Sequence, residues 1–407
     1  MSSSFKKIIP FAKPSIGTDE EDAVLRVLRS GWLTTGRETL AFEKEFQEFV
    51  SSKHALAVTS GTAGLHLALE ASGVEADQFV ITTPYTFAAT AEIIRYMHAH
   101  PLFVDILPDS YNIDPELVAK AVRENKHHVA AIIPVHIAGN ICDMKSLCEI
   151  TAEKNIHIIE DCAHAFPVKY NGKYAGTLGQ IGVYSFYANK TITTGEGGMI
   201  ATDNTEYTQR MKVMRTHGID REAWDRYSAQ NKWYYEIIEP GFKYNLSDIA
   251  SAIGRVQLTR ANDFLEKRRH IANIYIRELS GLDFLHIPAY TDDHAWHLFM
   301  IRIQPEYCTL SRNVFIEKLS ENGIGTSVHY TPLHIMPYYK NKYGYKPDDF
   351  PVSLANSQAC ISLPIYPDLD EEDLMYIIQT VKKIGQAHRP VHTAVPGSAA
   401  TSPKPEK

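Results

Sequence analysis

The stretch GVYSFYANKTITTGEGG, residues 182–198, ends an apolar run on Asn189 and a single lysine, Lys190, and then enters a turn rich in glycine. The run predicts a buried strand, and the glycines would let other groups approach the backbone closely. A lysine in an apolar pocket or near other charges has a lowered pKa, so its free amine can attack a carbonyl. Because most lysines simply point to solvent, this interpretation depends on what the rest of the chain places beside Lys190.

Apolar segments alternate with helical patterns around this stretch, from residue 54 to about residue 205. The strand candidates are HALAVTS (54–60), FVITT (79–83), PLFVDI (101–106), VAAIIPVH (129–136), IHIIED (156–161), IGVYSFY (181–187) and GMIATD (198–203). Near-continuous apolar strands that alternate with helices predict an α/β fold, with a mostly parallel sheet covered by helices on both faces. Ahead of them, residues 18–31 predict a helix with Thr18 as N-cap and Gly31 at its end.

The later part of the chain has a different pattern. Its predicted elements are a long helix over 246–279, strands over 294–303 and 325–330, and helices over 311–323 and 370–386. This order predicts a second, smaller α+β unit. We therefore expect a large α/β domain over residues 15–255 and a small C-terminal α+β domain over residues 256–386, with segment 5–14 packed nearby. Residues 387–407 are rich in Pro, Ser and Ala and are expected to be disordered.

Composition limits the functions that the chain can have. Of its 407 residues 44% are apolar, enough for a sizeable core, and the net charge of -7 disfavours a nucleic-acid or anionic-membrane surface. No apolar segment reaches the length of about 20 residues that a spanning helix needs, and the N-terminus has no signal-peptide pattern. The five cysteines form no CxxC pair, so we expect neither a disulfide framework nor a metal site, and a cytoplasmic location.

Two further features follow predicted strands, where open α/β sheets place their ligands. Ser60, Gly61 and Thr62 come where a strand ends and a helix begins, and backbone N–H groups at such a helix start can bind a phosphate. An ordinary capped turn is the plainer explanation. Phe87, in the loop after Pro84, could stack on a flat ligand or could simply cover the core.

Two adjacent carboxylates, Glu160 and Asp161, end a third strand, and His164 follows three residues later. Adjacent strand residues face opposite ways, so at most one of these carboxylates points at any one site. A buried carboxylate needs a partner, which a cationic heterocycle nitrogen or an ordinary salt bridge would provide. A phosphate cup, a stacking aromatic, a buried aspartate and an amine that forms a Schiff base are together the parts that pyridoxal 5'-phosphate (PLP) requires.

The sequence also resembles the sugar aminotransferases of the DegT/DnrJ/EryC1/StrS family, which have the PLP-dependent transferase fold type I of aspartate aminotransferase. The resemblance runs in family order from about residue 8 to residue 385. The segments that carry it are SGWLTTG (30–36), SGTAGLHLAL (60–69), PYTFAAT (84–90), PVHIAG (134–139), IEDCAHA (159–165), SFYANKTITTGEGGMI (185–200), GFKYNLSDIASAIGRVQL (241–258), HAWHLF (294–299) and VHYTPLH (328–334). Within the family, the chain looks most like members that aminate the UDP-linked 4-keto sugar UDP-4-keto-L-arabinose.

The resemblance implies a role for each matching residue. Lys190 would hold the cofactor and move the proton, Asp161 would pair with the pyridine nitrogen, and His164 would lie near the ring's 3-oxygen. The remaining cofactor-binding residues would be Gly61, Thr62, Ala63, Phe87, Ser185 and Asn245, the last of these reaching the phosphate of a neighbouring subunit. The substrate-binding residues would be Thr35, Tyr187, His329 and Tyr330.

The expected activity is ping-pong transfer of an amino group from L-glutamate, which leaves as 2-oxoglutarate, to the keto carbon of a nucleotide-linked sugar, UDP-linked and at C4. Such an enzyme would be a homodimer with shared active sites and would serve cell-surface polysaccharide or amino-sugar biosynthesis. A branch of the family that dehydrates sugars has histidine in place of Lys190, so transamination is favoured here. A different keto sugar or a cyclitol as substrate remains open, and so does a non-catalytic regulatory homologue, although such a protein could lose Lys190 or Asp161 without penalty.

Overall fold

The central element of the molecule is a seven-stranded sheet with the order β1-β9-β8-β5-β4-β2-β3. The computed structural model describes residues 7–125, 128–152, 154–220 and 235–390. The strands are β1 (His54–Val58), β2 (Phe79–Thr82), β3 (His100–Phe103), β4 (Val129–Ile132), β5 (His157–Asp161), β8 (Ile181–Ser185) and β9 (Gly198–Thr202). Only β9 runs antiparallel to its neighbours, so the predicted mostly parallel sheet is confirmed.

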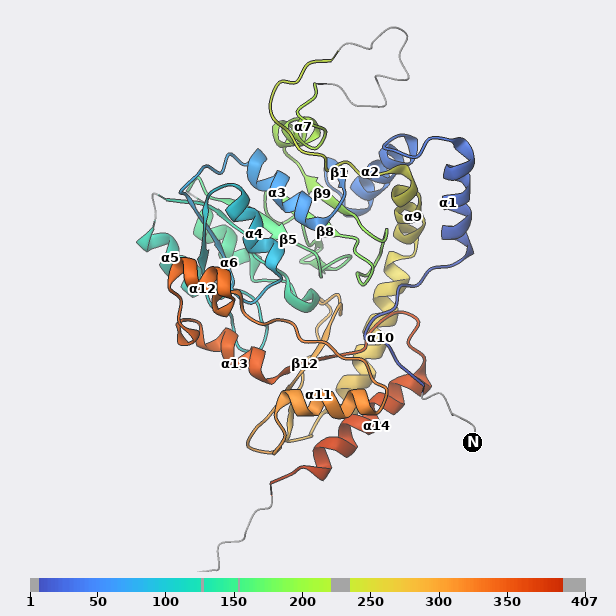
Figure 1. Cartoon of the computed structure of the whole chain (residues 1–407), viewed down its shortest axis with the longest axis vertical. Helices are drawn as coiled ribbons and strands as arrows, with labels where there is room; N and C mark the ends of the chain where they lie inside the picture. Colours follow the sequence, from blue (N-terminus) through green and yellow to red (C-terminus); the bar gives the residue numbers. More distant parts are fainter. Residues whose placement is uncertain (1–6, 126–127, 153, 221–234, 391–407) are drawn as a thin grey trace, which may run out of the picture.

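Helices cover both faces of this sheet (Figure 1). Alternate residues of each strand face opposite sides, so Leu56 and Val58 of β1 belong to one buried cluster while Ala55 and Ala57 belong to another. The Leu56 cluster includes residues of α3 (Gly61–Ala71), α4 (Ala88–Tyr96) and α7 (Thr205–Met214). The Ala57 cluster includes residues of α2 (Arg37–Val50), α5 (Pro115–Glu124) and α6 (Met144–Thr151). Next to α2 lies α9 (Asp248–Thr259), and α1 (Thr18–Ser30) packs on α9.

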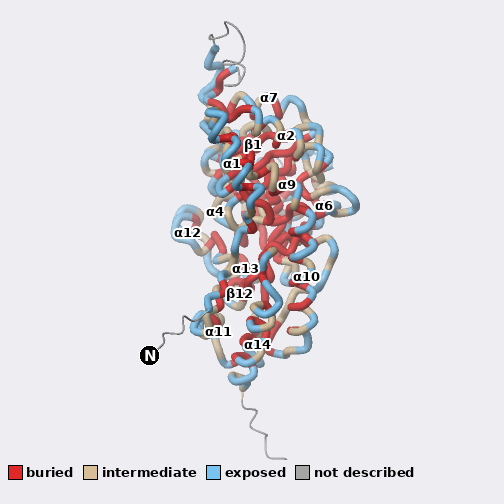
Figure 2. The backbone as a smooth tube through the Cα atoms, turned by 90° about the vertical axis from the view of Figure 1, so that its right-hand side faces the viewer, coloured by how far each residue is buried: buried red, intermediate tan, exposed pale blue. Residues whose placement is uncertain are grey.

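A second, three-stranded antiparallel sheet lies at the other end of the molecule. Its strands are β10 (Leu285–His286), β11 (Phe299–Ile303) and β12 (Cys360–Leu363), in the order β10-β11-β12. Three helices share its buried cluster: α10 (Ala261–Leu279), which runs from the large sheet towards the small one in Figure 1, α11 (Arg312–Glu321) and α14 (Glu371–Ala387). Figure 2 shows buried backbone in the interior of both halves.

The regularity of α14 follows from its sequence. Asp370 caps it by accepting a bond from the N–H of Asp373, and Leu374, Ile377, Ile378 and Val381 recur at helical spacing and are buried. The N-terminal segment joins the same half, because Ile9 exchanges backbone hydrogen bonds with Gly323 and Gly325. Residues 5–6 of the predicted N-terminal segment and 391–407 of the predicted tail lie outside the described residues.

Four local predictions were wrong. Gly17, not Thr18, is the N-cap of α1, and the Glu20 carboxylate accepts the Gly17 N–H. The predicted long helix is interrupted at Arg260, whose ψ of -2° separates α9 from α10. No strand forms over residues 325–330, where Ser327 makes a single bridge to Ser362. Only 299–303 of the predicted strand 294–303 belongs to the small sheet.

The shorter elements complete the description. They are the two-stranded ribbon β6 (Lys169–Tyr170) and β7 (Lys173–Tyr174), the helices α12 (Pro337–Tyr343) and α13 (Pro351–Ala359), and the 3-10 turns η1 (Ile137–Gly139), η2 (Leu333–Ile335) and η3 (Pro347–Asp349). Within the described ranges, none of the helices combines the length and apolar character that crossing a bilayer requires.

Candidate active site

The site lies where β5, β8 and β1 end at the same edge of the large sheet. Lys190 follows β8 in a turn in which its backbone N–H donates to the carbonyl of Tyr187 (2.9 Å). Its side chain is half-buried. Burial lowers the pKa of Lys190 to about 8; the charge of Asp161 opposes this shift and that of Arg268 adds to it. About one tenth of such an amine is uncharged at pH 7, against less than about one part in a thousand for an ordinary lysine, so the nucleophilic form is available near neutral pH.

Asp161 is the last residue of β5, the strand beside β8, and its side chain is buried. One carboxylate oxygen accepts the hydroxyl of Thr90 (2.9 Å) and the other accepts the backbone N–H of Ala163 (3.1 Å). Burial raises the pKa of Asp161, while these two donors and the charge of Lys190 act to lower it. The carboxylate is thus held in place by two fixed donors and interacts electrostatically with Lys190.

His164 lies beside this pair and is also buried. Its Nε2 is 3.1 Å from the hydroxyl of Tyr330, while its Nδ1 is buried without a hydrogen-bond partner in the described part of the chain. Burial, with the charge of Lys190, lowers the pKa of His164 well below its ordinary value, so the ring is neutral. Its unpartnered ring nitrogen is available to a ligand bound next to Lys190 and Asp161.

His329, predicted to face the substrate, also lies near Lys190. Its Nδ1 is 2.8 Å from the Ser362 hydroxyl, and its carbonyl accepts the hydroxyl of Tyr85 (2.6 Å). Burial lowers the pKa of His329 to about 4, and the charge of Lys190 acts in the same direction. The site therefore brings together neutral imidazoles, one lysine and one carboxylate.

The residues predicted to bind the phosphate come from chain segments that lie side by side in register. Ser185 of β8 and Val58 of β1 both pair with Gly198 of β9, and α3 begins three residues after Val58. A Cβ on Gly61 would lie 3.1 Å from the Cβ of Ser185, so Ser185 lies directly beside the start of α3.

The start of α3 has free donors. The Ser60 hydroxyl accepts the N–H of Ala63 (3.0 Å), and the first N–H groups of a helix, here those of Gly61 and Thr62, have no intrahelical acceptor. These donors and the Ser185 hydroxyl suit an anion. The N–H of Ala63 is therefore already hydrogen-bonded to Ser60. The N–H groups of Gly61 and Thr62 have no acceptor within the helix and can donate to an anion.

Two predicted aromatic residues are open to solvent. Phe87, the N-cap of α4, is 64% exposed, and its ring centroid lies 6.4 Å from that of Tyr330. Tyr187, in the turn before Lys190, is 48% exposed. Neither ring fills the core of its own chain, so the plainer explanation that Phe87 covers the core is wrong.

Asn245 and Thr35 lie against each other. The Asn245 amide donates to the Thr35 hydroxyl (2.6 Å), which itself donates to the carbonyl of Leu246 (2.5 Å), and Asn245 forms a bridge to Val58 at the end of β1. Asn245 therefore lies close to the exit of β1. The N-cap of α9 is Ser247, whose hydroxyl accepts the N–H of Ala250, so Asn245 does not cap this helix.

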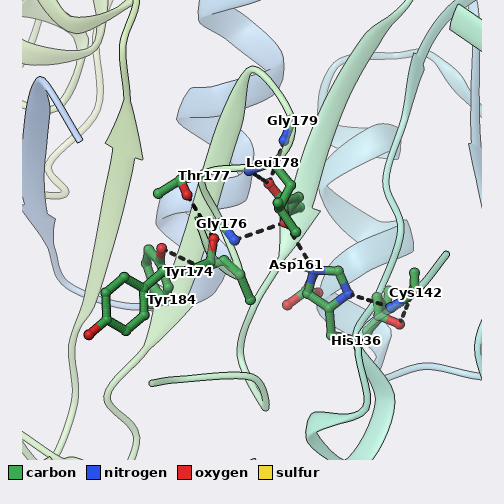
Figure 3. Close-up of polar contacts among 12 residues, drawn as sticks. His136, Cys142, Asp161, Tyr174, Gly176, Thr177, Leu178, Gly179 and Tyr184 are labelled. Carbon is green, nitrogen blue, oxygen red and sulfur yellow. Dashed lines mark hydrogen bonds and ion pairs between the residues drawn. The ribbon is translucent and has the colours of Figure 1, made fainter. Parts of the chain in front are cut away.

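Glu160 faces away from the site, as alternation along β5 requires. It is fully buried, and its two oxygens accept the N–H groups of Gly176 (2.8 Å), Leu178 (2.7 Å) and Gly179 (2.6 Å). His136 contributes a fourth bond through Nε2 (3.1 Å), because its Nδ1 is occupied by a backbone N–H. Figure 3 shows these backbone groups on one side and His136 on the other.

The same neighbourhood superficially resembles a metal site. One ligand atom each from His136, Glu160 and Cys162 lies within 4.8 Å of the others. However, the carboxylate and the imidazole are already hydrogen-bonded, and burial raises the pKa of the Cys162 thiol to about 12, so the thiol remains protonated. A protonated thiol is a poor ligand, and this cluster is a structural network.

The structure adds three residues that were not singled out from the sequence. Thr90 holds Asp161, Arg268 acts on the pKa of Lys190, and His297 packs on His164 with ring centroids 4.4 Å apart. All three had a signal in the sequence. Arg268 stands at an apolar position of a helix, between Leu265 and Ile271, while Thr90 and His297 lie in the PYTFAAT and HAWHLF segments.

Comparison with known proteins places this geometry in context. The profile of the DegT/DnrJ/EryC1/StrS aminotransferase family matches residues 14–382. The spore coat polysaccharide biosynthesis protein SpsC of Bacillus subtilis is 40% identical over 379 residues, which are 92% of this chain and 97% of SpsC.

Two solved structures extend the comparison. PseC of Helicobacter pylori, an aminotransferase involved in the biosynthesis of pseudoaminic acid, superposes with a TM-score of 0.87 at 29% identity and covers 94% of this chain and 100% of its own. Spr1654 of Streptococcus pneumoniae, assigned as a sugar aminotransferase, has a TM-score of 0.86 at 30% identity in its pyridoxamine phosphate (PMP) form, with 93% of this chain and 99% of its own covered, and is also known in a PLP form.

Proposed function

Because the chain belongs to the DegT/DnrJ/EryC1/StrS aminotransferase family, we propose that this PLP-dependent sugar aminotransferase acts on a nucleotide-linked keto sugar. The proposed donor is L-glutamate, and the proposed acceptor is the C4 carbonyl of a UDP-linked sugar. The enzyme would work in the cytoplasm, in amino-sugar or cell-surface polysaccharide biosynthesis.

One observation carries the proposal: Lys190, whose pKa is lowered to about 8, and Asp161, held by Thr90 and Ala163, interact at the ends of two adjacent strands. An amine and a buried carboxylate so placed suit the aldehyde and the ring nitrogen of one flat cofactor. The orphan Nδ1 of His164 supplies a third contact. A purely regulatory homologue has no need of this arrangement.

When bound, PLP supplies an electron sink for charge that develops next to the amine. The chain's own residues perform the remaining tasks. Asp161 would keep the ring nitrogen protonated, the start of α3 with Ser185 would bind the phosphate, and Lys190 would hold the aldehyde and later carry the proton at its Nζ. The amino group passes in two half-reactions, first from glutamate and then to the sugar.

The proposed sugar substrate is supported by the residues at the open side of the site and by two relatives. His329, Tyr330 and Tyr187 lie there with polar groups that can contact sugar hydroxyls. SpsC and PseC belong to the biosynthesis of a polysaccharide and of a sugar acid, which supports a sugar acceptor. The preference for a UDP-linked 4-keto sugar is supported by the HAWHLF and VHYTPLH segments.

The test is a half-reaction assay with the full chain. The protein is converted to its pyridoxamine phosphate form with L-glutamate, freed of donor, and mixed with a panel of UDP-, dTDP- and GDP-linked 4-keto and 3-keto sugars and a keto cyclitol. We expect the visible absorbance of the PLP form to return fastest with a UDP-linked 4-keto sugar. Return only with the cyclitol or with a 3-keto sugar would reject the proposed substrate but not the activity.

Lys190→Ala is the matched control for this assay. It should bind PLP without any cofactor becoming fixed by borohydride reduction and should not turn over, while circular dichroism shows an unchanged fold. Fixed cofactor in this variant would mean that another amine is the attachment site. Failure of glutamate to convert the wild-type protein would reject L-glutamate as donor.

A further inference from the structure

Two buried imidazoles, His164 and His297, pack against each other in a tilted arrangement near Lys190. Their ring centroids are 4.4 Å apart with an interplanar angle of 31°. His164 follows β5 of the large sheet, whereas His297 precedes β11 of the small sheet, so the contact joins the two halves of the molecule. In the described part of the chain, neither Nδ1 has a hydrogen-bond partner.

The backbone of His297 is held from both sides. Its N–H donates to the carbonyl of Ala138 (2.9 Å), and its carbonyl accepts a bond from the buried guanidinium of Arg268 (3.3 Å). The same Arg268 nitrogen also donates to the carbonyls of Trp296 (3.3 Å) and Ile365 (2.9 Å). A buried cation that serves only backbone carbonyls here fixes the segment from which the His297 ring projects.

The face of the His164 ring, its Nε2 and its Nδ1 therefore each have a different environment. One face of its ring rests on His297, and its Nε2 is engaged by the Tyr330 hydroxyl at 3.1 Å. Its Nδ1 remains for a ligand. Without the His297 ring, the remaining ring and hydrogen-bond contacts of the His164 ring in the described part of the chain would be those with Tyr330: the hydrogen bond at Nε2 and a near-parallel ring whose centroid lies 6.2 Å away. The face now covered by His297 would lose its support.

We propose that His297 is a positioning residue of the cofactor site: its flat ring supports His164 and thereby holds His164 Nδ1 towards the ring oxygen of bound PLP. This inference rests on the proposed location of His164 beside that oxygen. The alternative is that His297 merely fills the core. The two differ in their consequences, because a displaced donor at the ring oxygen changes the protonation of the bound cofactor and a change in packing alone does not.

The test uses the PLP-loaded full chain and two variants that fill the space. His297→Phe keeps a flat ring, and His297→Leu keeps a similar volume without one. The readout is the pH titration of the visible absorbance of the bound cofactor. We expect His297→Leu to shift the midpoint by about 0.5 to 1 pH unit and to weaken cofactor binding about tenfold, and His297→Phe to remain close to wild type.

His294→Leu is the matched control. His294 lies in the same segment and is equally buried, but its ring stacks on Trp296 (4.0 Å between centroids) and its Nδ1 accepts the backbone N–H of Trp296. The His294→Leu variant should leave the midpoint of the pH titration unchanged. A shift as large as that of His297→Leu would show that any lesion in this segment suffices, and would overturn the proposal.

A double-mutant comparison tests whether His297 acts through His164. His164→Ala should shift the midpoint by itself, and adding His297→Leu should shift it no further. Independent, additive shifts would contradict the proposal, as would a wild-type titration in either His297→Leu or, if that variant does not fold, His297→Asn. If wild-type protein fixes no cofactor on borohydride reduction, the proposed function fails instead.

Discussion

At the scale of single residues, the site gathers groups whose pKa values are shifted from their ordinary values. Lys190 has a pKa lowered to about 8, and burial lowers the pKa of His164 and of His297 well below the ordinary value. Burial raises the pKa of Asp161. Shifts that gather around one lysine and one buried carboxylate are typical of a catalytic site.

The pKa of Lys190 gives a prediction for cofactor attachment. Only the uncharged amine attacks the aldehyde, so attachment of PLP to the apoprotein should be slow below pH 7, should rise through a midpoint near 8 and should level off above it. Stopped-flow absorbance across pH 6 to 10.5 measures the midpoint. A rate that still climbs at pH 10, as for a solvated lysine, would contradict the lowered pKa.

Asp161→Asn should slow amine transfer by about 100-fold or more. An amide cannot hold the ring nitrogen protonated. Its single oxygen can still accept the Ala163 N–H, while its NH₂ can donate to the Thr90 hydroxyl, which also accepts hydrogen bonds. Single-turnover kinetics with L-glutamate measures the loss, and the cofactor dissociation constant should rise in parallel. Thr90→Val is the companion variant, with a smaller loss expected because it removes only one support of the carboxylate. Near-normal turnover of Asp161→Asn would refute the role of the charge.

At the scale of elements, prediction from sequence succeeded where periodicity was strong. The seven strands of the large sheet and α14 alternate or recur regularly and were predicted within a few residues. The failures have local causes. Residues 246–279 keep helical periodicity across Arg260, so nothing in the pattern marks the bend.

Other failures come from tertiary contacts. Segment 294–298 has the alternation of a strand but pairs with the loop at 138–140 instead of with the small sheet: Ala295 and His297 donate to the carbonyls of Gly139 and Ala138. The partners of the site residues could not be predicted for the same reason. Thr90, Arg268 and His297 reach the site from distant parts of the chain, and sequence spacing carries no information on that convergence.

Gly139 is the tightest point of this pairing. It has a φ of 97°, and a Cβ there would lie 2.8 Å from both the Ala295 Cβ and the His164 carbonyl oxygen. Gly139→Ala should therefore destabilise the protein by about 2 to 4 kcal/mol, through backbone strain and overpacking together. Urea unfolding of the apoprotein measures this.

Gly172→Ala separates the two causes. Gly172 has a φ of 83° but nothing within 4 Å of an added Cβ, so its variant carries the backbone strain alone and should lose only about 1 kcal/mol. Equal losses at the two positions would mean that the contact with His164 and Ala295 is unimportant.

Glu160→Gln should destabilise the fold by at least about 2 kcal/mol. One oxygen of Glu160 accepts Leu178 and Gly179 and the other accepts Gly176 and His136, so an amide places its NH₂ against two donors whichever way it is turned. Urea unfolding should show this loss, whereas the exposed Glu124→Gln should change stability by less than about 0.5 kcal/mol. An equally small effect at Glu160 would contradict the bonding described.

At the scale of the whole molecule, a single chain leaves the site open. Tyr187, in the turn of Lys190, and Phe87, whose ring lies near that of Tyr330, are 48% and 64% exposed, although both are predicted to contact ligands. Asn245 lies at the exit of β1, held by Thr35. We propose that a second copy covers this side, with Asn245 reaching the phosphate of its neighbour, through an interface above roughly 2,000 Å² in total.

Mixing two inactive chains tests the shared site. Lys190→Ala and Asn245→Ala chains are combined under conditions that allow subunit exchange. If the site is shared, one site of each heterodimer carries both lesions and the other carries neither, so activity should return to at most about one quarter of wild type for a random mixture of chains. If heterodimers form, Asn245→Ala alone is impaired and mixing restores nothing, the site belongs to one chain.

The position of β1 at the edge of the large sheet has a consequence for how the protein is made. Val58 pairs with Gly198, so β1, the first strand of the large sheet to leave the ribosome, has as its partner β9, the last strand of that sheet to be made. At about 5 to 20 residues per second, β1 waits on the order of ten seconds for β9 to be synthesised. The start of α3 meets Ser185 only then. Capture of the cofactor is thus a late event in the life of the nascent chain, and a prematurely terminated one has no cup in which to hold it.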